Sequence, residues 1–432
     1  MLHQHPEYNG LFAKHFSGLE LFLDAEIIKN PSPEYIDDFF KQLKNHKRYD
    51  EIKDDFIYDK DLDIFIHIHN RFLLSEIDDL SDEEKFFYSF MNKDEIKRAF
   101  NIKSASDFLL RFRAEQVETS ARLKRVFSKL KSKFGDKWKF ANYFESKQYR
   151  KYLNRLSHER KVICLDIPHG TIHAKEANGM CMRTPYGNVI VLSYALRHFL
   201  FYMNLFHYGE YLGVASEDIL AAFVLAIRIM IGTESLDFEI DSRGRLPGSM
   251  KKKIDYVTDW QMNFIIGHEY AHHYLGHLKS KSILKSNPRA SDLKNDIKYY
   301  TYNQQCEFEA DLYSISEVSY NEYEKAQMLD GAFLFFSFLE MYNRVEEYFS
   351  PKKQYPLTHP DPLDRMWRLH ESIKIDGCLT KDDLESIVSY NSKFVESFLV
   401  DFLPYNIESI EDVGSVYLPS YRKKILVDRL DM

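Results

Sequence analysis

The stretch FIIGHEYAHHYLGHL, residues 264–278, holds four histidines and one glutamate among apolar and small residues. We predict that it belongs to a largely buried helix that begins at Thr258. Residues four apart share one face of a helix, so His268 and His272 can direct imidazole nitrogens at a single metal ion. Glu269 lies beside them, angled away from the ion and placed to take a proton from a water there. This spacing is the HExxH pattern.

The competing interpretation is a buried helix whose histidines are satisfied by ordinary hydrogen bonds. Four histidines on such a helix need polar partners, which favours a site over plain core. His273 and His277 form a second pair with the same spacing, on a different face of the helix. We expect this pair to pack or hydrogen-bond beside the site, so that mutating it affects stability more than metal binding.

The HExxH pattern requires a third ligand, because catalytic zinc normally has three protein ligands and leaves its fourth position to water. The extended HExxHxxGxxH pattern does not supply it, since Leu275 and Leu278 stand where its glycine and third histidine would be. This spacing excludes the metzincin class.

A second acidic motif lies downstream in QQCEFEADLYSI, residues 304–315. Glu307 and Asp311 are four residues apart and share a helix face, whereas Glu309 points almost to the opposite side. We predict that Glu307 is the third ligand and that Asp311 accepts the other ring N–H of a ligand histidine. Taken alone, this segment is more typical of a solvated acidic helix start. Downstream of HExxH, it completes a metal site.

HExxH followed by ExxAD on a second helix resembles the gluzincin zinc metallopeptidases, and HEYAHHYLGH is most similar to the HtpX and CAAX-prenyl-protease group. The segment THPDPLDRMWRL, residues 358–369, is similar to the HPxxxxR element of that group, with His359 and Arg365 at the matching positions. The resemblance covers about residues 185–370. It implies one zinc ion per chain and endopeptidase activity on a protein or peptide substrate.

The resemblance also implies a role for each matching residue: zinc ligands His268, His272 and Glu307, general base Glu269, Asp311 behind the ligands, oxyanion donor His359 and neighbouring Arg365. A loop residue before a proline is the alternative for His359. Because gluzincins pair an edge strand with the substrate backbone, the candidate substrate strand is formed by Val189, Ile190, Val191 and Leu192. An ordinary core strand is equally compatible with that segment.

A weaker resemblance, in HExxH and compartment only, is to the phage-exclusion peptidase Lit, and it implies a narrow protein substrate. The alternative to a peptidase is a metal-containing binding protein or a nucleic-acid-associated effector without proteolytic turnover. One basic run, which begins at Arg122 and ends at Lys161, could contact an acidic or nucleic-acid partner. The same run is more typical of a solvated helix face.

The whole sequence predicts an α+β protein that is predominantly helical. We expect a helical N-terminal domain in residues 1–160, basic toward its end, and a helical extension in residues 376–432. Between them, residues 161–375 should form a zincin-like catalytic domain with a small sheet and an active-site helix.

Individual elements follow from β-branched runs and from capping patterns. Strands are expected at IFIHIH (64–69), VICLDIPHG (162–170) and GNVIVLSYAL (187–196). A helix is expected from an N-cap at Ser216 to Ile231, with Gly232 as its stop.

The composition limits location and partners. The net charge of −8 over 432 residues does not indicate a general polyanion binder. The four cysteines form no CxxC pair, and the N-terminus lacks the features of a secretory signal. The most apolar run, residues 219–231, is shorter than the roughly 20 residues of a membrane span. We therefore expect a cytoplasmic protein that does not insert into membranes.

Overall fold

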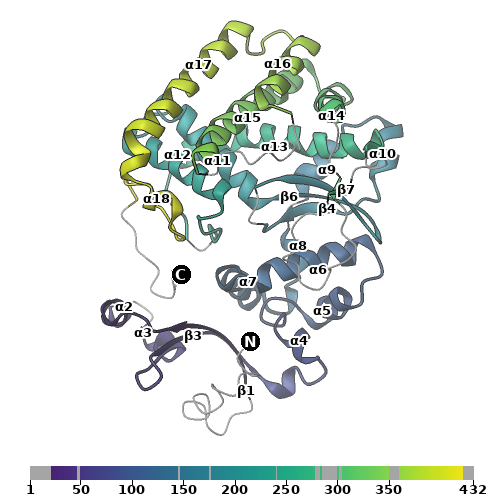
Figure 1. Ribbon diagram of the computed structural model, residues 1–432. Coiled ribbons are helices and arrows are strands. Elements are labelled where there is room, and N and C mark those ends of the chain that lie inside the picture. The colour runs from purple at the N-terminus through teal and green to yellow at the C-terminus, as the bar shows by residue number, and fades with distance from the viewer. Residues whose placement is uncertain are drawn as a thin grey trace.

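The computed structural model describes residues 21–45, 49–144, 146–174, 177–239, 241–277, 283–284, 299–300, 304–349 and 360–421. These residues form a mostly helical molecule with three small sheets (Figure 1). The expected α+β, predominantly helical class is confirmed.

The first part of the chain departs from the expected helical domain, because residues 21–73 contain a three-stranded antiparallel sheet in the order β1-β3-β2. The strand expected at residues 64–69 is confirmed as part of β3. Its two partner strands were missed because their charged residues imitate a helical pattern, and strand pairing depends on contacts distant in sequence. The elements are β1 (Leu21–Lys29), α2 (Pro33–Lys44), α3 (Tyr49–Ile52), β2 (Phe56–Asp59) and β3 (Ile64–Leu73).

A group of helices follows, as expected for the rest of the N-terminal part. The strand predicted in VICLDIPHG is wrong over most of its length, because α10 extends to Cys164 and only the end of the segment enters β4. Ser157 caps α10 by accepting a hydrogen bond from the Arg160 N–H, and this local start outweighs the β-branched Val162 and Ile163. The helices are α4 (Asp82–Lys85), α5 (Lys93–Phe100), α6 (Ala105–Glu118), α7 (Ala121–Phe134), α8 (Phe140–Tyr143), α9 (Lys147–Leu153) and α10 (His158–Cys164).

The second sheet has the order β4-β6-β5, so β6 is its central strand, parallel to β4 and antiparallel to β5. The prediction of a substrate-binding edge is therefore wrong for Val189, Ile190, Val191 and Leu192, which are fully buried in β6. Their continuous run of branched apolar side chains suits a strand covered on both faces. The edge strands are β4 and β5, and the outer side of each pairs with no strand among the described residues. The strands are β4 (His169–Ile172), β5 (Gly179–Thr184) and β6 (Gly187–Ser193).

Two apolar helices, α11 (Tyr194–Tyr208) and α12 (Ser216–Ile231), pack against each other after this sheet. The predicted end of α12 is confirmed, because Gly232 terminates it in the left-handed region at φ 85°. The predicted N-cap is off by one residue, since Ala215 occupies the cap position and Ser216 is the first helical residue.

The next helix, α13 (Gly248–Tyr274), lies between the β4-β6-β5 sheet and the long helix α15 (Glu322–Phe349) (Figure 1). The prediction that it begins at Thr258 is wrong, because Thr258 and Gln261 lie inside it and accept hydrogen bonds from the buried amide of Asn204. The two side chains therefore make a tertiary contact and do not cap the helix. α13 also packs on α14 (Gln304–Ser316), the helix of the acidic motif.

Two of the remaining helices pack against α15, one packs against α12, and one of the two short strands lies beside β5. None of the described helices combines the length and the apolar character that a membrane crossing needs. These elements are β7 (Ile283–Leu284), β8 (Tyr299–Tyr300), α16 (Pro362–Ser372), α17 (Lys381–Ser397) and α18 (Glu408–Glu411).

Candidate metal centre

Helices α13 and α14 bring together two imidazoles and one carboxylate. The Nε2 atoms of His268 and His272 lie 2.9 Å apart, and the Glu307 carboxylate lies 3.5 Å from the first and 3.3 Å from the second. Two ligand atoms of a tetrahedral ion at about 2.0–2.1 Å are roughly 3.4 Å from each other. The three side chains that the sequence singled out therefore face one point, at a spacing that a metal ion could occupy.

The cluster is buried and carries an excess of negative charge. His272 and Glu307 are 0% exposed and His268 is 6% exposed. Glu269, Glu307 and Asp311 contribute three buried carboxylates, and the cation that contacts two of them is Arg365 from α16. Buried carboxylates are costly unless they are paired with positive charge. A divalent cation would balance the charge that Arg365 leaves uncompensated.

His268 is held from behind by Asp311, the role predicted for that carboxylate. Its Nδ1 lies 2.8 Å from Asp311 Oδ1, and Arg365 clamps the same carboxylate through Nε at 2.8 Å and Nη2 at 2.6 Å. With its Nδ1–H donated to Asp311, His268 presents the Nε2 lone pair to the ligand point.

The charges around this pair set its protonation in the metal-free chain. Burial lowers the pKa of His268, but the hydrogen bonds to Asp311 and Glu307 outweigh it and raise the pKa to about 10. Burial alone would raise the pKa of Asp311, but the charge of Arg365 and the bonds to Arg365 and His268 lower it. When no metal is bound, the positive charge of protonated His268 therefore balances part of the negative charge of the carboxylates.

The second ligand histidine has a different support. His272 Nδ1 lies 2.9 Å from His277 Nδ1, whose other ring nitrogen lies 3.2 Å from Glu309. Burial, together with the charge of His268, lowers the pKa of His272 to about 3. His273 and His277 both hydrogen-bond beside the cluster, as expected, but to different partners, because the ring of His273 bonds to Asn188.

The carboxylate of Glu269 lies under the edge strand β5. A Cβ at Gly179 would come within 3.1 Å of Glu269 Oε1 and within 3.1 Å of Ile265 on the same helix. A side chain at this position would force the carboxylate or Ile265 to shift by a few tenths of an ångström, so glycine suits this close approach. Sequence reasoning missed Gly179, since nothing local to it indicates that it faces α13.

Two other predicted site residues have different outcomes. Arg365 reaches the centre, but through Asp311 and Glu307. His359 lies outside the described residues.

The basic run between residues 122 and 161 is only partly a solvated surface. Lys124 and Arg125 are buried, and Arg122 donates hydrogen bonds to Ser235 and Ser415. The ammonium group of Lys131 donates to the backbone carbonyls of residues 88 and 91. Several of its charges therefore join the helices to the rest of the protein.

Comparisons of the chain with protein-family models, with curated proteins and with solved structures found no match. The chemistry of this site therefore rests on its own geometry: a buried His268, His272 and Glu307 cluster that could bind a metal ion.

Proposed function

We propose that the protein is a zinc-dependent metallopeptidase with a zincin-like catalytic region built on α13 and α14. The observation that carries this proposal is the convergence of His268 Nε2, His272 Nε2 and the Glu307 carboxylate, with Glu269 in the same helical turn. Two imidazoles and one carboxylate are the donor set of catalytic zinc in several peptidases, and three protein ligands leave a position open to water. Structural zinc sites usually have four protein ligands.

The proposed chemistry divides between the ion and the chain. Bound zinc supplies Lewis acidity toward a carbonyl and lowers the pKa of water. Glu269 accepts the proton of the attacking water and returns it to the leaving amine. Asp311 and Arg365 keep His268 oriented, and the resemblance to gluzincins assigns the oxyanion contact to His359.

The proposed substrate is a protein or peptide segment in extended conformation, and the supporting feature is β5. This strand lies at the edge of its sheet, and at Gly179 its backbone passes directly beside Glu269. A segment that added to the outer side of β5 would run along the proposed site, with backbone hydrogen bonds supplying affinity. This assignment replaces the one that the sequence suggested for β6.

The proposal is tested by replacing Glu269 with Gln in the full chain. Wild type and Glu269→Gln are expressed in cells, and new peptide termini in the proteome are identified by mass spectrometry. We expect zinc content near one per chain in both proteins and a loss of cleavage of about 10²–10⁴-fold in the variant. Asp259→Asn, which removes an exposed carboxylate from the same helix, is the matched control and should cleave as wild type does.

Two outcomes count against the proposal. Equal cleavage by Glu269→Gln would show that another group is the base. Zinc binding without any cleavage by the wild type would make the protein a metal-containing binding protein.

A further inference from the structure

The two ligand histidines need the same tautomer but obtain it from different partners. A histidine that ligates through Nε2 carries its proton on Nδ1, so each Nδ1–H needs an acceptor. For His268 that acceptor is a carboxylate, Asp311. For His272 it is the neutral ring of His277, at 2.9 Å between the two Nδ1 atoms.

His277 reaches this position because the helix ends just before it. α13 stops at Tyr274, and Gly276 adopts φ 78°, a left-handed conformation that suits glycine and turns the chain. The turn directs the ring of His277 back onto the helix, where its side chain is 7% exposed. A continued helix would have placed His277 about 140° around the helix axis from His272.

The proton positions of this pair then fix the next contact. Each neutral imidazole has one N–H and one acceptor nitrogen. If His277 accepts at Nδ1, its proton is on Nε2, and that N–H points at Glu309 at 3.2 Å. The line His272, His277, Glu309 is therefore directional, with each ring donating to the next group.

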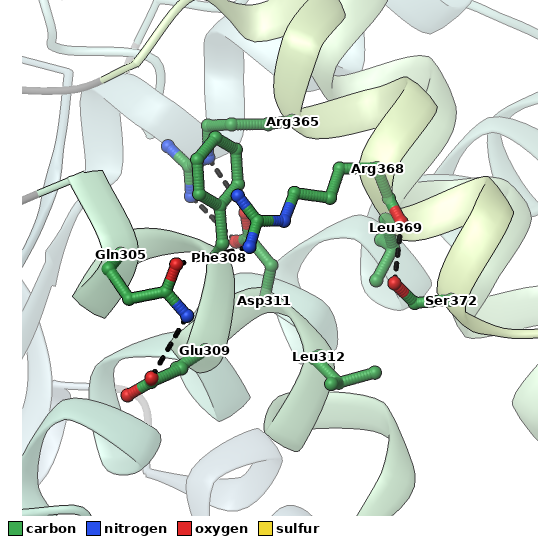
Figure 2. Close-up of a pocket in the computed structure, with 9 residues that line it drawn as sticks. All are labelled: Gln305, Phe308, Glu309, Asp311, Leu312, Arg365, Arg368, Leu369 and Ser372. Carbon is green, nitrogen blue, oxygen red and sulfur yellow. Dashed lines mark hydrogen bonds and ion pairs between the residues drawn. The ribbon is translucent and has the colours of Figure 1, made fainter.

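This chain of hydrogen bonds ends at a surface pocket of about 100 Å³, which is lined by Glu309, Gln305, Asp311 and Arg365 among others. The side-chain amide of Gln305 donates to Glu309 at 3.0 Å, and its oxygen accepts a hydrogen bond from Arg368 (Figure 2). The supports of both ligand histidines thus open into one pocket on α14 and α16, which places Glu309 within reach of solvent.

We propose that His277 and Glu309 are positioning residues of the metal centre: they hold the proton of His272 on Nδ1 and aim its Nε2 at the ion. This inference rests on the proposed function only in requiring that zinc binds at His268, His272 and Glu307. Replacing His277 should therefore change metal affinity. Replacing His273, the nearby histidine bonded to Asn188, should leave metal affinity unchanged.

The test measures zinc affinity of the purified full chain by competition with a chromogenic chelator. His277→Phe keeps a ring of similar size and removes the acceptor, and we expect zinc affinity to fall about 10–100-fold. His277→Gln returns an oxygen acceptor and should recover most of that loss. Glu309→Leu should weaken zinc binding about 3–10-fold, because His277 keeps its contact with His272 but loses its anchor. His273→Phe is the matched control, with unchanged affinity.

A second readout separates positioning from packing. Cobalt(II) bound in place of zinc reports ligand geometry through its visible spectrum, and we expect a shifted spectrum in His277→Phe and the wild-type spectrum in His273→Phe. Unchanged zinc affinity and an unchanged spectrum in His277→Phe would overturn the inference. Should that variant fail to fold, Glu309→Leu decides alone, since Glu309 is partly exposed and an unchanged affinity there would overturn it as well.

The failures of the two proposals are distinguishable. A wild-type chain that binds zinc but cleaves no protein overturns the peptidase and leaves this experiment intact. A wild-type chain that binds no zinc overturns both. A complete loss of zinc in both His277→Phe and His277→Gln would make His277 a ligand and not a positioning residue.

Discussion

Two buried clusters of charged residues in this protein look alike in composition and differ in what their atoms point at. The ligand cluster, beside α14, consists of His268, His272, Glu307, Asp311 and Arg365. The arginine cluster lies at the end of α12 and in the connection that follows it, and consists of Arg228, Glu234, Asp237, Asp241 and Arg243.

In the arginine cluster the chain supplies its own cations. Arg243 contacts Glu234 at 2.6 Å, Asp237 at 2.7 Å and Asp241 at 2.9 Å, and Arg228 contacts the other oxygen of Glu234 at 2.8 Å. Arg228 also donates to backbone carbonyls of residues 409 and 412, which ties the C-terminal part of the chain to this connection. Donors and acceptors of the chain face each other, and the arginine cluster connects two distant segments of the protein.

In the ligand cluster, three potential metal ligands face one another. Two imidazole Nε2 atoms and the Glu307 carboxylate surround one point, and Arg365 approaches Asp311 and Glu307 from the other side. Burial and charge alone therefore do not indicate a metal site. What distinguishes the ligand cluster is that two imidazole nitrogens and a carboxylate converge on one point, an arrangement that a metal ion stabilises.

The largest expected difference between the two clusters is in metal binding, and loss of the third ligand, Glu307, tests it. Glu307→Ala should lower zinc affinity by about 5 kcal/mol, roughly a third of the free energy of a tight zinc site, or more than a thousandfold. The stability of the metal-free chain should change little, because Arg365 and His268 keep Asp311 as their partner. Metal analysis and thermal unfolding with and without chelator measure the two quantities.

Glu309→Ala is the control for this experiment, because the same helix loses a carboxylate that does not face the ligand point. It should retain zinc near one per chain, with affinity reduced no more than about tenfold. The reverse pattern, zinc lost in Glu309→Ala and kept in Glu307→Ala, would show that the wrong carboxylate was assigned.

The ligand cluster was largely predictable from sequence because its spacing is local. His268 and His272, like Glu307 and Asp311, share a helix face at four-residue spacing, so a correct helix assignment is enough to pair them. The end of α12 at Gly232 was predictable for the same reason, since termination depends on one backbone conformation.

Contacts between distant segments could not be predicted from the sequence. The approach of Gly179 to Glu269 depends on how β5 crosses α13, and the place of β6 in its sheet depends on which strands pair with it. Thr258 failed as a helix start because its polar partner, Asn204, lies on another helix. His277 was assigned to the wrong face because the helix was extended past the turn at Gly276.

The next prediction concerns the arginine cluster, whose ion pairs should stabilise the folded protein. Arg243→Leu leaves three buried carboxylates with one arginine, and breaking a buried pair on one side costs about 3–5 kcal/mol. We expect the free energy of unfolding to fall by about 4 kcal/mol, measured by denaturant titration, with zinc affinity of the folded protein unchanged. Arg245→Leu, at an exposed position two residues away, should shift stability by less than about 0.5 kcal/mol. A loss below about 1 kcal/mol in Arg243→Leu would contradict the assignment.

The smallest effect concerns a buried ionisable group outside both clusters. His173 is 4% exposed, it stacks on Tyr194 at 4.5 Å, and neither of its ring nitrogens has a hydrogen-bond partner among the described residues. Burial, aided by the charge of Arg113, lowers its pKa to about 3. Because the unfolded chain binds this proton near pH 6.5, the unfolded state gains protons first as the pH falls. The contribution of His173 is therefore complete above about pH 6.5 and is lost progressively toward pH 3.

His173→Phe removes that dependence while keeping an aromatic ring in the same apolar surroundings. Between pH 7 and pH 5 the wild type should lose about 2 kcal/mol more stability than the variant, since one proton separates the two states over most of that interval. Denaturant titrations at the two pH values measure the difference, and His158→Phe, at an exposed position of α10, should match the wild type. An equal loss in wild type and His173→Phe would mean that His173 is protonated in the folded protein. The protein would then hold a buried imidazolium cation that has no hydrogen-bond partner among the described residues, unlike the cations of either cluster.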